Sequence, residues 1–273
     1  MPHYTNKVKV LSPLLAIAYS DNKGARLNYP TKAQTDLLLN GAAAARRIMR
    51  AAVAELDRVV YLRRPEGEPF TSIMNYHFGL AANRLNPMLK SNAVDKSLGL
   101  KAIGQKDRRW ILNKIRMGML SISFHLNTGV YLIDVDIGTR NIIGGVADTP
   151  GAGEEGYVVG GANNPATGKF TPHCGLLSGF KNGEIHVAFA FMQQHGYTAE
   201  AVARVIIHEA SHKYWGVADY YYAHQTAGYR QLNCVEAVDN ADSFAWAAVS
   251  LDQGALVHGT DSNDLHHQAA LVP

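Results

Sequence analysis

The chain has 273 residues, of which 47% are hydrophobic and 18% are charged. This balance is typical of a globular protein with a sizeable core, and it excludes a disordered or fibrous chain. The formal net charge of +3 is too small to indicate a polyanionic partner. The arginine pairs at 46–47, 63–64 and 108–109 are scattered, so we interpret them as solvated helix faces and expect no nucleic-acid binding.

No apolar stretch approaches the roughly 20 residues that a spanning helix needs, so we expect no membrane span. Residues 10–18 imitate the apolar core of a signal peptide, but Ser12 and Pro13 interrupt it. We predict a buried first strand there instead. Two locations remain open, namely export by a route without a cleaved signal and the cytoplasm.

Two helices are predicted in the N-terminal half. Residues 31–62 are rich in alanine, and Pro65 would end that helix. A second helix is predicted over residues 106–121, where apolar residues recur at helical spacing. We expect residues 1–130 to form a mainly helical subregion that serves as a scaffold.

The middle of the chain alternates strands with a long loop. Residues 130–135 and 185–189 are rich in β-branched and aromatic residues, which favours strands. Between them, residues 138–175 are punctuated by glycine and proline. Loops of this length are usually functional lids or disordered. We hypothesise that this segment flanks or covers the site described next.

The most informative pattern is His208-Glu209-Ala210-Ser211-His212. Thr198 and Gly216 are suited to begin and end a helix around it. A spacing of four residues places both imidazoles on one helix face, which is how an H-E-x-x-H helix binds zinc. The alternative interpretation is an amphipathic helix whose histidines and glutamate are merely solvated.

Asp219 follows His208 by eleven residues and can supply a third ligand. Two imidazole nitrogens and a carboxylate oxygen suit Zn²⁺ and leave one position open for water. Glu209 would act as the general base toward that water, and a tyrosine hydroxyl could stabilise the oxyanion. The pattern therefore predicts a zinc-dependent hydrolase and favours a peptidase. We expect the strand at 185–189, just before this helix, to offer an edge for substrate binding.

The motif at 208–212, the run Gly-Val-Ala-Asp-Tyr-Tyr-Tyr at 216–222 and the run Asn-Ala-Asp-Ser-Phe at 240–244 resemble the aspzincin metallopeptidases. This family includes deuterolysin and the peptidyl-Lys metalloendopeptidases, and the similarity covers residues 183–250. The resemblance implies a zincin-like fold and zinc held by His208, His212 and Asp219. It also implies Glu209 as the base and Tyr222 as the oxyanion stabiliser.

Two departures from the family concern the loop and the substrate pocket. Val217 replaces the usual threonine, and the loop from His212 to Asp219 is short. Asp242 resembles an acidic residue that recognises a substrate ammonium in the lysine-directed branch, but Ala245 replaces its acidic partner. A preference for lysine therefore stays open, and the alternative for Asp242 is a helix N-cap.

Together these patterns predict an α+β fold with an HExxH active-site helix, a small mixed sheet and a helical N-terminal half. We expect one metallopeptidase domain over residues 1–273, with residues 131–273 as the catalytic subregion. The expected activity is hydrolysis of a protein or peptide substrate. A zinc amidase acting on cell-wall peptides and a non-catalytic zinc-binding toxin or partner module remain alternatives. The sequence does not fix the oligomeric state.

The C-terminal histidines and the two cysteines have no assigned functional role. His258, His266 and His267 are expected to lie in a solvated tail. Cys174 and Cys234 are interpreted as buried residues or as one bridge.

Overall fold

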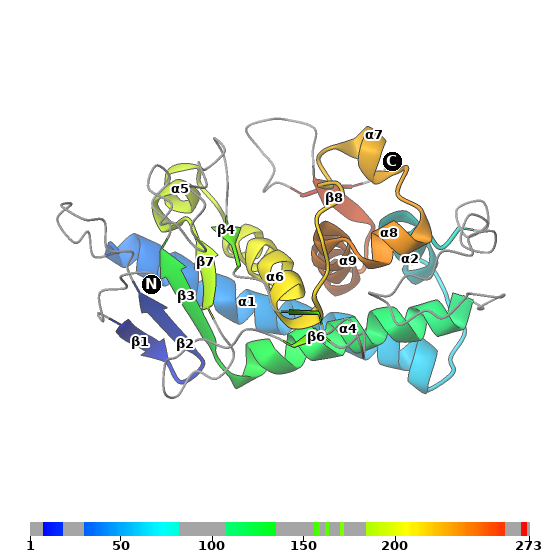
Figure 1. Cartoon of the computed structure of the whole chain (residues 1–273), viewed down its shortest axis with the longest axis horizontal. Coiled ribbons are helices and arrows are strands. Elements are labelled where there is room, and N and C mark those ends of the chain that lie inside the picture. Colours follow the sequence, from blue (N-terminus) through cyan, green and yellow to red (C-terminus); the bar gives the residue numbers. More distant parts are fainter. Residues whose placement is uncertain are drawn as a thin grey trace.

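The computed structural model describes residues 8–18, 30–81, 108–134, 156–158, 162–163, 170–171, 184–259 and 269–271. Figure 1 shows a sheet at one end of the molecule and the helices α2, α8 and α9 at the other end, with α1 and α4 running between the two ends. Helices and strands are mixed, so the predicted α+β class is confirmed at this level. No described helix combines the length and the apolar character needed to cross a bilayer.

The main sheet has five strands in the order β1-β2-β3-β7-β4. Its strands are β1 (Val8–Ser12), β2 (Leu15–Ala18), β3 (Val130–Asp134), β7 (Glu184–Val187) and β4 (Gly156–Tyr157). The strands β2, β3 and β7 are parallel, whereas β1 and β4 each pair antiparallel with a neighbour. Residues 10–18 thus belong to two paired strands and not to one. Leu15 and Ile17 of β2 are fully buried, whereas Val10 of β1 is 62% exposed, so the predicted buried strand is confirmed only for β2.

The strand β7 was expected to offer an edge for substrate binding, and this expectation is wrong. β7 lies between β3 and β4, so both of its sides are paired with other strands. The two residues of β4 form the edge next to it. A two-residue strand inside a glycine-rich segment carries too little alternation to be recognised from sequence.

The helices comprise α1 (Lys32–Leu56), the π-helical segment η1 (Asp57–Tyr61), α2 (Phe70–Phe78), α4 (Arg108–Thr128), α5 (Phe189–Gln194), α6 (Ala199–Trp215), α7 (Thr226–Tyr229), α8 (Cys234–Val238) and α9 (Ala241–Gln253). Two short hairpins pair β5 (Ala162–Asn163) with β6 (Phe170–Thr171) and β8 (Val257–Gly259) with β9 (Ala269–Leu271). The two long N-terminal helices are therefore confirmed. The first, α1 with η1, ends before Pro65, and α4 continues beyond the predicted end.

The helix α1 forms the centre of the helical packing, because α4, α6 and α9 all pack against it. A capping box begins it, in which the Thr31 hydroxyl accepts a hydrogen bond from the Gln34 amide at 3.2 Å. Arg46 lies in this packing and is 8% exposed. The interpretation of residues 46–47 as a solvated face is therefore wrong for Arg46, whose pKa is lowered by burial and by the charge of Arg50.

The C-terminal histidines and the cysteines are described only in part. His258 lies in β8, half-buried, with its ring centroid 5.5 Å from that of Tyr76. The expected solvated tail is therefore wrong for His258. Cys234 is fully buried, whereas Cys174, His266 and His267 lie outside the described residues.

The contact between α1 and α6 depends on Gly41. A Cβ atom at this position would lie 2.7 Å from the Cβ atom of Val202, which is closer than two carbon atoms pack. We predict that Gly41→Val lowers the free energy of unfolding by about 2 kcal/mol through overpacking. The exposed neighbour Ala43 provides the control on the same helix, since Ala43→Val costs less than about 0.7 kcal/mol in helix propensity. Denaturant titration measures both, and equal effects would contradict the close packing.

Candidate metal site

The helix α6 carries both histidines of the motif. The Thr198 hydroxyl accepts a hydrogen bond from the Ala201 amide at 3.1 Å, and Gly216 ends the helix in the left-handed conformation at φ 78°. Both predicted helix ends are confirmed. The imidazole rings of His208 and His212 are neighbours, with centroids 4.9 Å apart.

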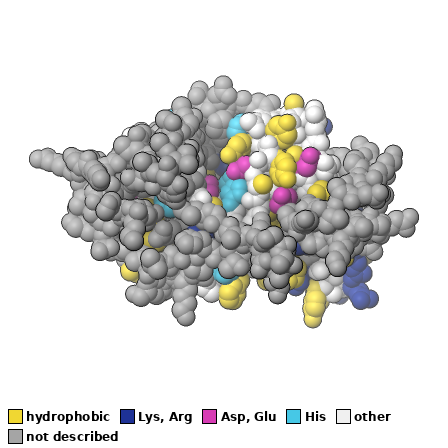
Figure 2. Space-filling model, in the orientation of Figure 1, with side chains coloured by type: hydrophobic (Ala, Val, Ile, Leu, Met, Phe, Trp, Pro, Cys, Tyr) yellow, Lys and Arg dark blue, Asp and Glu magenta, His cyan; other side chains and the backbone are white. Residues whose placement is uncertain are grey.

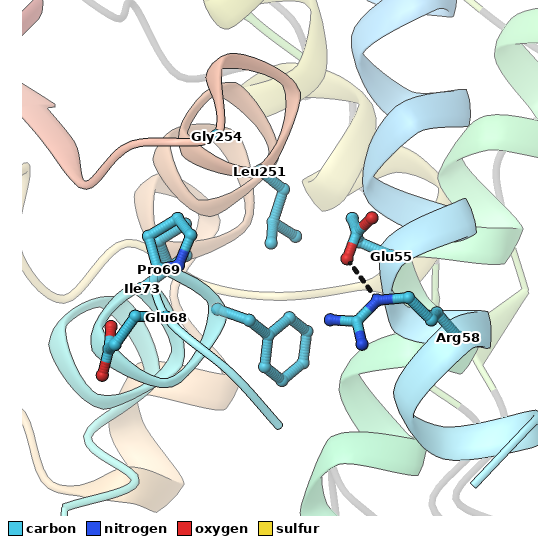
Figure 3. Close-up of a pocket in the computed structure, with 8 residues that line it drawn as sticks. Glu55, Arg58, Glu68, Pro69, Ile73, Leu251 and Gly254 are labelled. Atoms are coloured by element: carbon cyan, nitrogen blue, oxygen red, sulfur yellow. Dashed lines mark hydrogen bonds and ion pairs between the residues drawn. The ribbon is translucent and has the colours of Figure 1, made fainter. Parts of the chain in front are cut away.

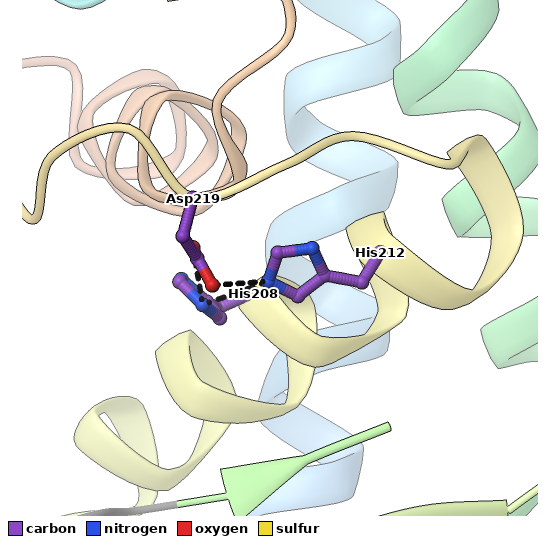
Figure 4. A group of neighbouring side chains, drawn as sticks. All are labelled: His208, His212 and Asp219. Atoms are coloured by element: carbon purple, nitrogen blue, oxygen red, sulfur yellow. Dashed lines mark hydrogen bonds and ion pairs between the residues drawn. The ribbon is translucent and has the colours of Figure 1, made fainter. Parts of the chain in front are cut away.

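Asp219 completes a group of three ligand-type side chains (Figure 4). Its two carboxylate oxygens lie 3.3 Å from His208 Nε2 and 3.1 Å from His212 Nε2. The two Nε2 atoms lie 3.2 Å apart. Residues from a helix and from the loop that follows it are therefore brought together as the sequence predicts.

These distances suit a tetrahedral metal site. Zinc binds imidazole nitrogen and carboxylate oxygen at about 2.0–2.2 Å, so two ligands of a tetrahedral ion lie about 3.3–3.5 Å apart. The three separations of 3.1–3.3 Å are within a few tenths of an ångström of that value. The chemistry and the spacing of the donor set thus fit Zn²⁺.

The other nitrogen of each ring is held by a hydrogen bond. His212 Nδ1 donates to the carbonyl oxygen of Val217 at 2.7 Å. His208 Nδ1 donates to the Asp242 carboxylate at 2.8 Å. Because Nδ1 carries the hydrogen in both rings, the lone pair of a neutral imidazole is on Nε2 and points into the group, as a metal ligand requires.

The two histidines and Asp219 shift one another's pKa values. Burial disfavours the charged form of His208, but hydrogen bonds to Asp219 and Asp242 outweigh it and raise the pKa of His208 well above its ordinary value. The pKa of His212 is also raised, since the hydrogen bond to Asp219 outweighs burial. Burial of the Asp219 carboxyl is outweighed by hydrogen bonds from both histidines, which hold its pKa well below the ordinary value. Zinc binding would displace the protons that the two Nε2 atoms share with the Asp219 carboxylate when the histidines are charged.

Asp242 is buried beside His208, and the N-cap role that the sequence offered as the alternative is wrong. The side chain is 2% exposed, and its second oxygen accepts a hydrogen bond from the Ala223 amide at 2.6 Å. Both oxygens are thus already engaged, which argues against binding of a substrate ammonium. The N-cap of α9 is Asn240 rather than Asp242. Burial of the carboxyl is outweighed by the hydrogen bond from His208, so the pKa of Asp242 is lowered, and the carboxylate orients that ring.

Asn240 holds the loop that carries Asp219, a role that the sequence did not indicate. Its side-chain oxygen accepts hydrogen bonds from the amides of Tyr220 and Tyr221 at 2.9 and 3.3 Å, and its side-chain nitrogen donates to the Tyr221 carbonyl at 3.0 Å. A backbone bridge joins Ala218 to the same residue. The loop is therefore fixed to the N-terminal end of α9.

Glu209 and Tyr222 have different neighbours beside the ligand pair. Glu209 is 5% exposed, and a Cβ atom at Gly156 in β4 would lie 3.2 Å from its Oε1 atom. The Tyr222 ring is 40% exposed and stacks on the His208 ring, with centroids 5.7 Å apart and an interplanar angle of 14°. Histidine and acidic side chains lie together on this face of the molecule (Figure 2).

Only fragments of residues 138–175 are described. Two of them, β4 and β6, contact α6. The contacts of β4 and β6 with α6 agree with the hypothesis that residues 138–175 flank the candidate metal site. That this segment also covers the site stays a prediction. The remaining residues of this segment lie outside the described part of the chain.

No protein-family model matches the chain, and no curated protein is significantly similar to it. The geometry of the site and the H-E-x-x-H motif therefore indicate the function.

A pocket of about 310 Å³ lies apart from the metal group, between α1, α2 and the C-terminal end of α9 (Figure 3). Apolar side chains line it together with Glu55, Arg58 and Glu68. Glu55 and Arg58 form an ion pair across 2.9 Å. Its lining residues include no histidine or cysteine, so we assign it no metal.

The hydrogen bond from His208 to Asp242 leads to a testable prediction. We expect Asp242→Asn to weaken zinc binding about 10- to 100-fold, because the ring loses its anionic acceptor. Asp252→Asn is the matched control on the same helix, since it loses only the ion pair with Arg47. Competition with a chromophoric chelator measures both affinities. An unchanged affinity in Asp242→Asn would remove the orienting role of this carboxylate.

Proposed function

We propose that the protein is a zinc-dependent endopeptidase, with His208, His212 and Asp219 as the zinc ligands and Glu209 as the general base. The observation that carries this proposal is the close grouping of the two Nε2 atoms, 3.2 Å apart, with the Asp219 carboxylate, which has one oxygen within 3.1–3.3 Å of each. Glu209 directly follows the first of these histidines on α6. Membership of the aspzincin family is part of the same proposal, since the third ligand is an aspartate shortly after the helix.

Each residue has a distinct task in this proposal. Zinc, when bound, polarises the scissile carbonyl and lowers the pKa of water. Glu209 takes a proton from the attacking water and returns it to the leaving amine. Its carboxylate is largely shielded from bulk solvent at 5% exposure, so the proton would be kept within the site.

Tyr222 is proposed to donate its hydroxyl hydrogen to the developing oxyanion. Stacking on His208 fixes the plane of its ring beside a ligand. The His224 ring also stacks on Tyr222, with centroids 5.6 Å apart and an interplanar angle of 16°. These two ring contacts support a role that requires the phenol to stay beside the ligands.

The edge strand β4 supports an extended peptide as the substrate. Among the described residues it is the last strand of the main sheet, and it lies next to Glu209. Backbone groups at a sheet edge can pair with an added strand regardless of its side chains. A peptide bound in this way would pass close to the general base.

Glu209→Gln provides the direct test of the proposed chemistry. We expect zinc content to stay at one ion per chain and casein hydrolysis to fall about 100- to 10,000-fold, because the amide cannot accept the proton. Glu200→Gln is the matched control, as it makes the same change at an exposed position of α6. Unimpaired hydrolysis by Glu209→Gln would refute the base, and absence of zinc from the unmodified protein would refute the metal site.

Tyr222→Phe tests the oxyanion role. We expect kcat to fall about 100-fold with little change in zinc affinity, since only a hydrogen-bond donor is lost. Tyr220→Phe is the control, because this neighbour is similarly exposed and its hydroxyl donates instead to Asp239 at 3.3 Å. Steady-state kinetics on a fluorogenic peptide separates the two variants. Equal activity of both variants would exclude Tyr222 from the reaction.

A further inference from the structure

The outer face of α4 carries an exposed apolar stripe. Met117, Leu120 and Phe124 are 43%, 37% and 62% exposed. Their spacing of three and four residues places them on one side of the helix. The opposite side supplies the fully buried Ile115, Met119 and Ile122 to the core. The stripe is therefore an apolar surface in addition to the one that α4 uses for folding.

The stripe continues onto the end of the first long helix. Tyr61 and Leu62 are 72% and 60% exposed. Arg116 lies between the two parts, with its guanidinium 5.7 Å from the Tyr61 ring centroid and its Nη1 atom 3.8 Å from the Met117 sulfur. We call the set of Tyr61, Leu62, Met117, Leu120 and Phe124 the apolar ridge.

Cationic side chains flank the apolar ridge. The helix α4 contains Arg108, Arg109, Lys114 and Arg116 but no aspartate or glutamate. Arg108 and Arg116 are paired with Glu66 and Asp57, so these two ion pairs add no net charge. Arg63 and Arg64 directly follow the ridge residues of the first helix. Both are exposed, and no ion pair joins them to a described carboxylate.

We propose that the apolar ridge and its flanking arginines bind the surface of an anionic lipid bilayer. Exposed aromatic and aliphatic side chains next to cations are the combination that partitions into the headgroup region of such a membrane. The charge is complementary, since Arg63 and Arg64 beside the ridge are cationic and phosphatidylglycerol or phosphatidylserine headgroups are anionic. The chain would lie on the bilayer with α4 parallel to its surface.

A second copy of the chain is the competing occupant of the ridge. Stable protein interfaces bury about 20–30 residues on each side, whereas the ridge consists of five side chains. Its size and its surrounding arginines thus favour a lipid surface. Figures 1 and 2 place α4 along the lower edge of the molecule, where hydrophobic and basic side chains protrude next to each other.

Co-sedimentation of the full chain with vesicles tests this proposal. One set of vesicles contains equal amounts of phosphatidylcholine and phosphatidylglycerol, and the other contains phosphatidylcholine alone. We expect binding to the anionic vesicles to be stronger and to weaken as salt is added. The variant Arg63→Gln/Arg64→Gln should bind roughly 25-fold more weakly, at about fivefold for each arginine.

The variant Leu120→Ser/Phe124→Ser should weaken binding at least tenfold. Both side chains are exposed, so we expect far-UV circular dichroism and thermal unfolding to stay unchanged. Val10→Ser and Arg230→Gln are the controls, because they change an exposed apolar residue and an exposed arginine elsewhere. Three results would overturn the proposal. These are no binding to anionic vesicles at low salt, equal binding by ridge and control variants, and a dimer in solution that Leu120→Ser/Phe124→Ser dissociates.

Discussion

The hydrogen bond between His208 and Asp242 is the interaction on which the proposed metal site depends. Asp242 is buried, and a buried carboxylate is tolerated only where hydrogen bonds and positive charge compensate it. Arg204, one helical turn before His208, lies 3.9 Å from the same carboxylate and stacks over Trp246. The ring orientation at the metal site is thus linked to the packing of α6 against α9. A change in this packing would alter the site without touching a ligand.

Local sequence was sufficient to predict the helix that carries the ligands. The N-cap Thr198, the left-handed Gly216 and the four-residue histidine spacing all act within one element, and the structure has each of them where the pattern placed it. Asp219 was also found, because a short loop keeps it near the end of its helix. The long α1 and α4 were recognisable for the same reason, since helical periodicity is a local property.

Contacts between distant segments were not predictable in the same way. Asp242 lies 34 residues after His208, and nothing in either segment specifies that they meet. The edge position of β4 and the burial of Arg46 likewise follow from how whole elements pack. The role of Asn240 illustrates this limit most clearly, because an asparagine before a helix predicts a cap. Here its side chain instead fixes the loop that bears a ligand.

The absence of a side chain at Gly156 has a consequence for protein engineering. Any Cβ atom there would meet the His186 carbonyl oxygen at 2.6 Å as well as the Glu209 side chain at 3.2 Å. The carbonyl belongs to the backbone of β7 and cannot move aside as a flexible side chain could. Randomised libraries that vary the surroundings of Glu209 should therefore keep position 156 constant and begin their diversity at position 157.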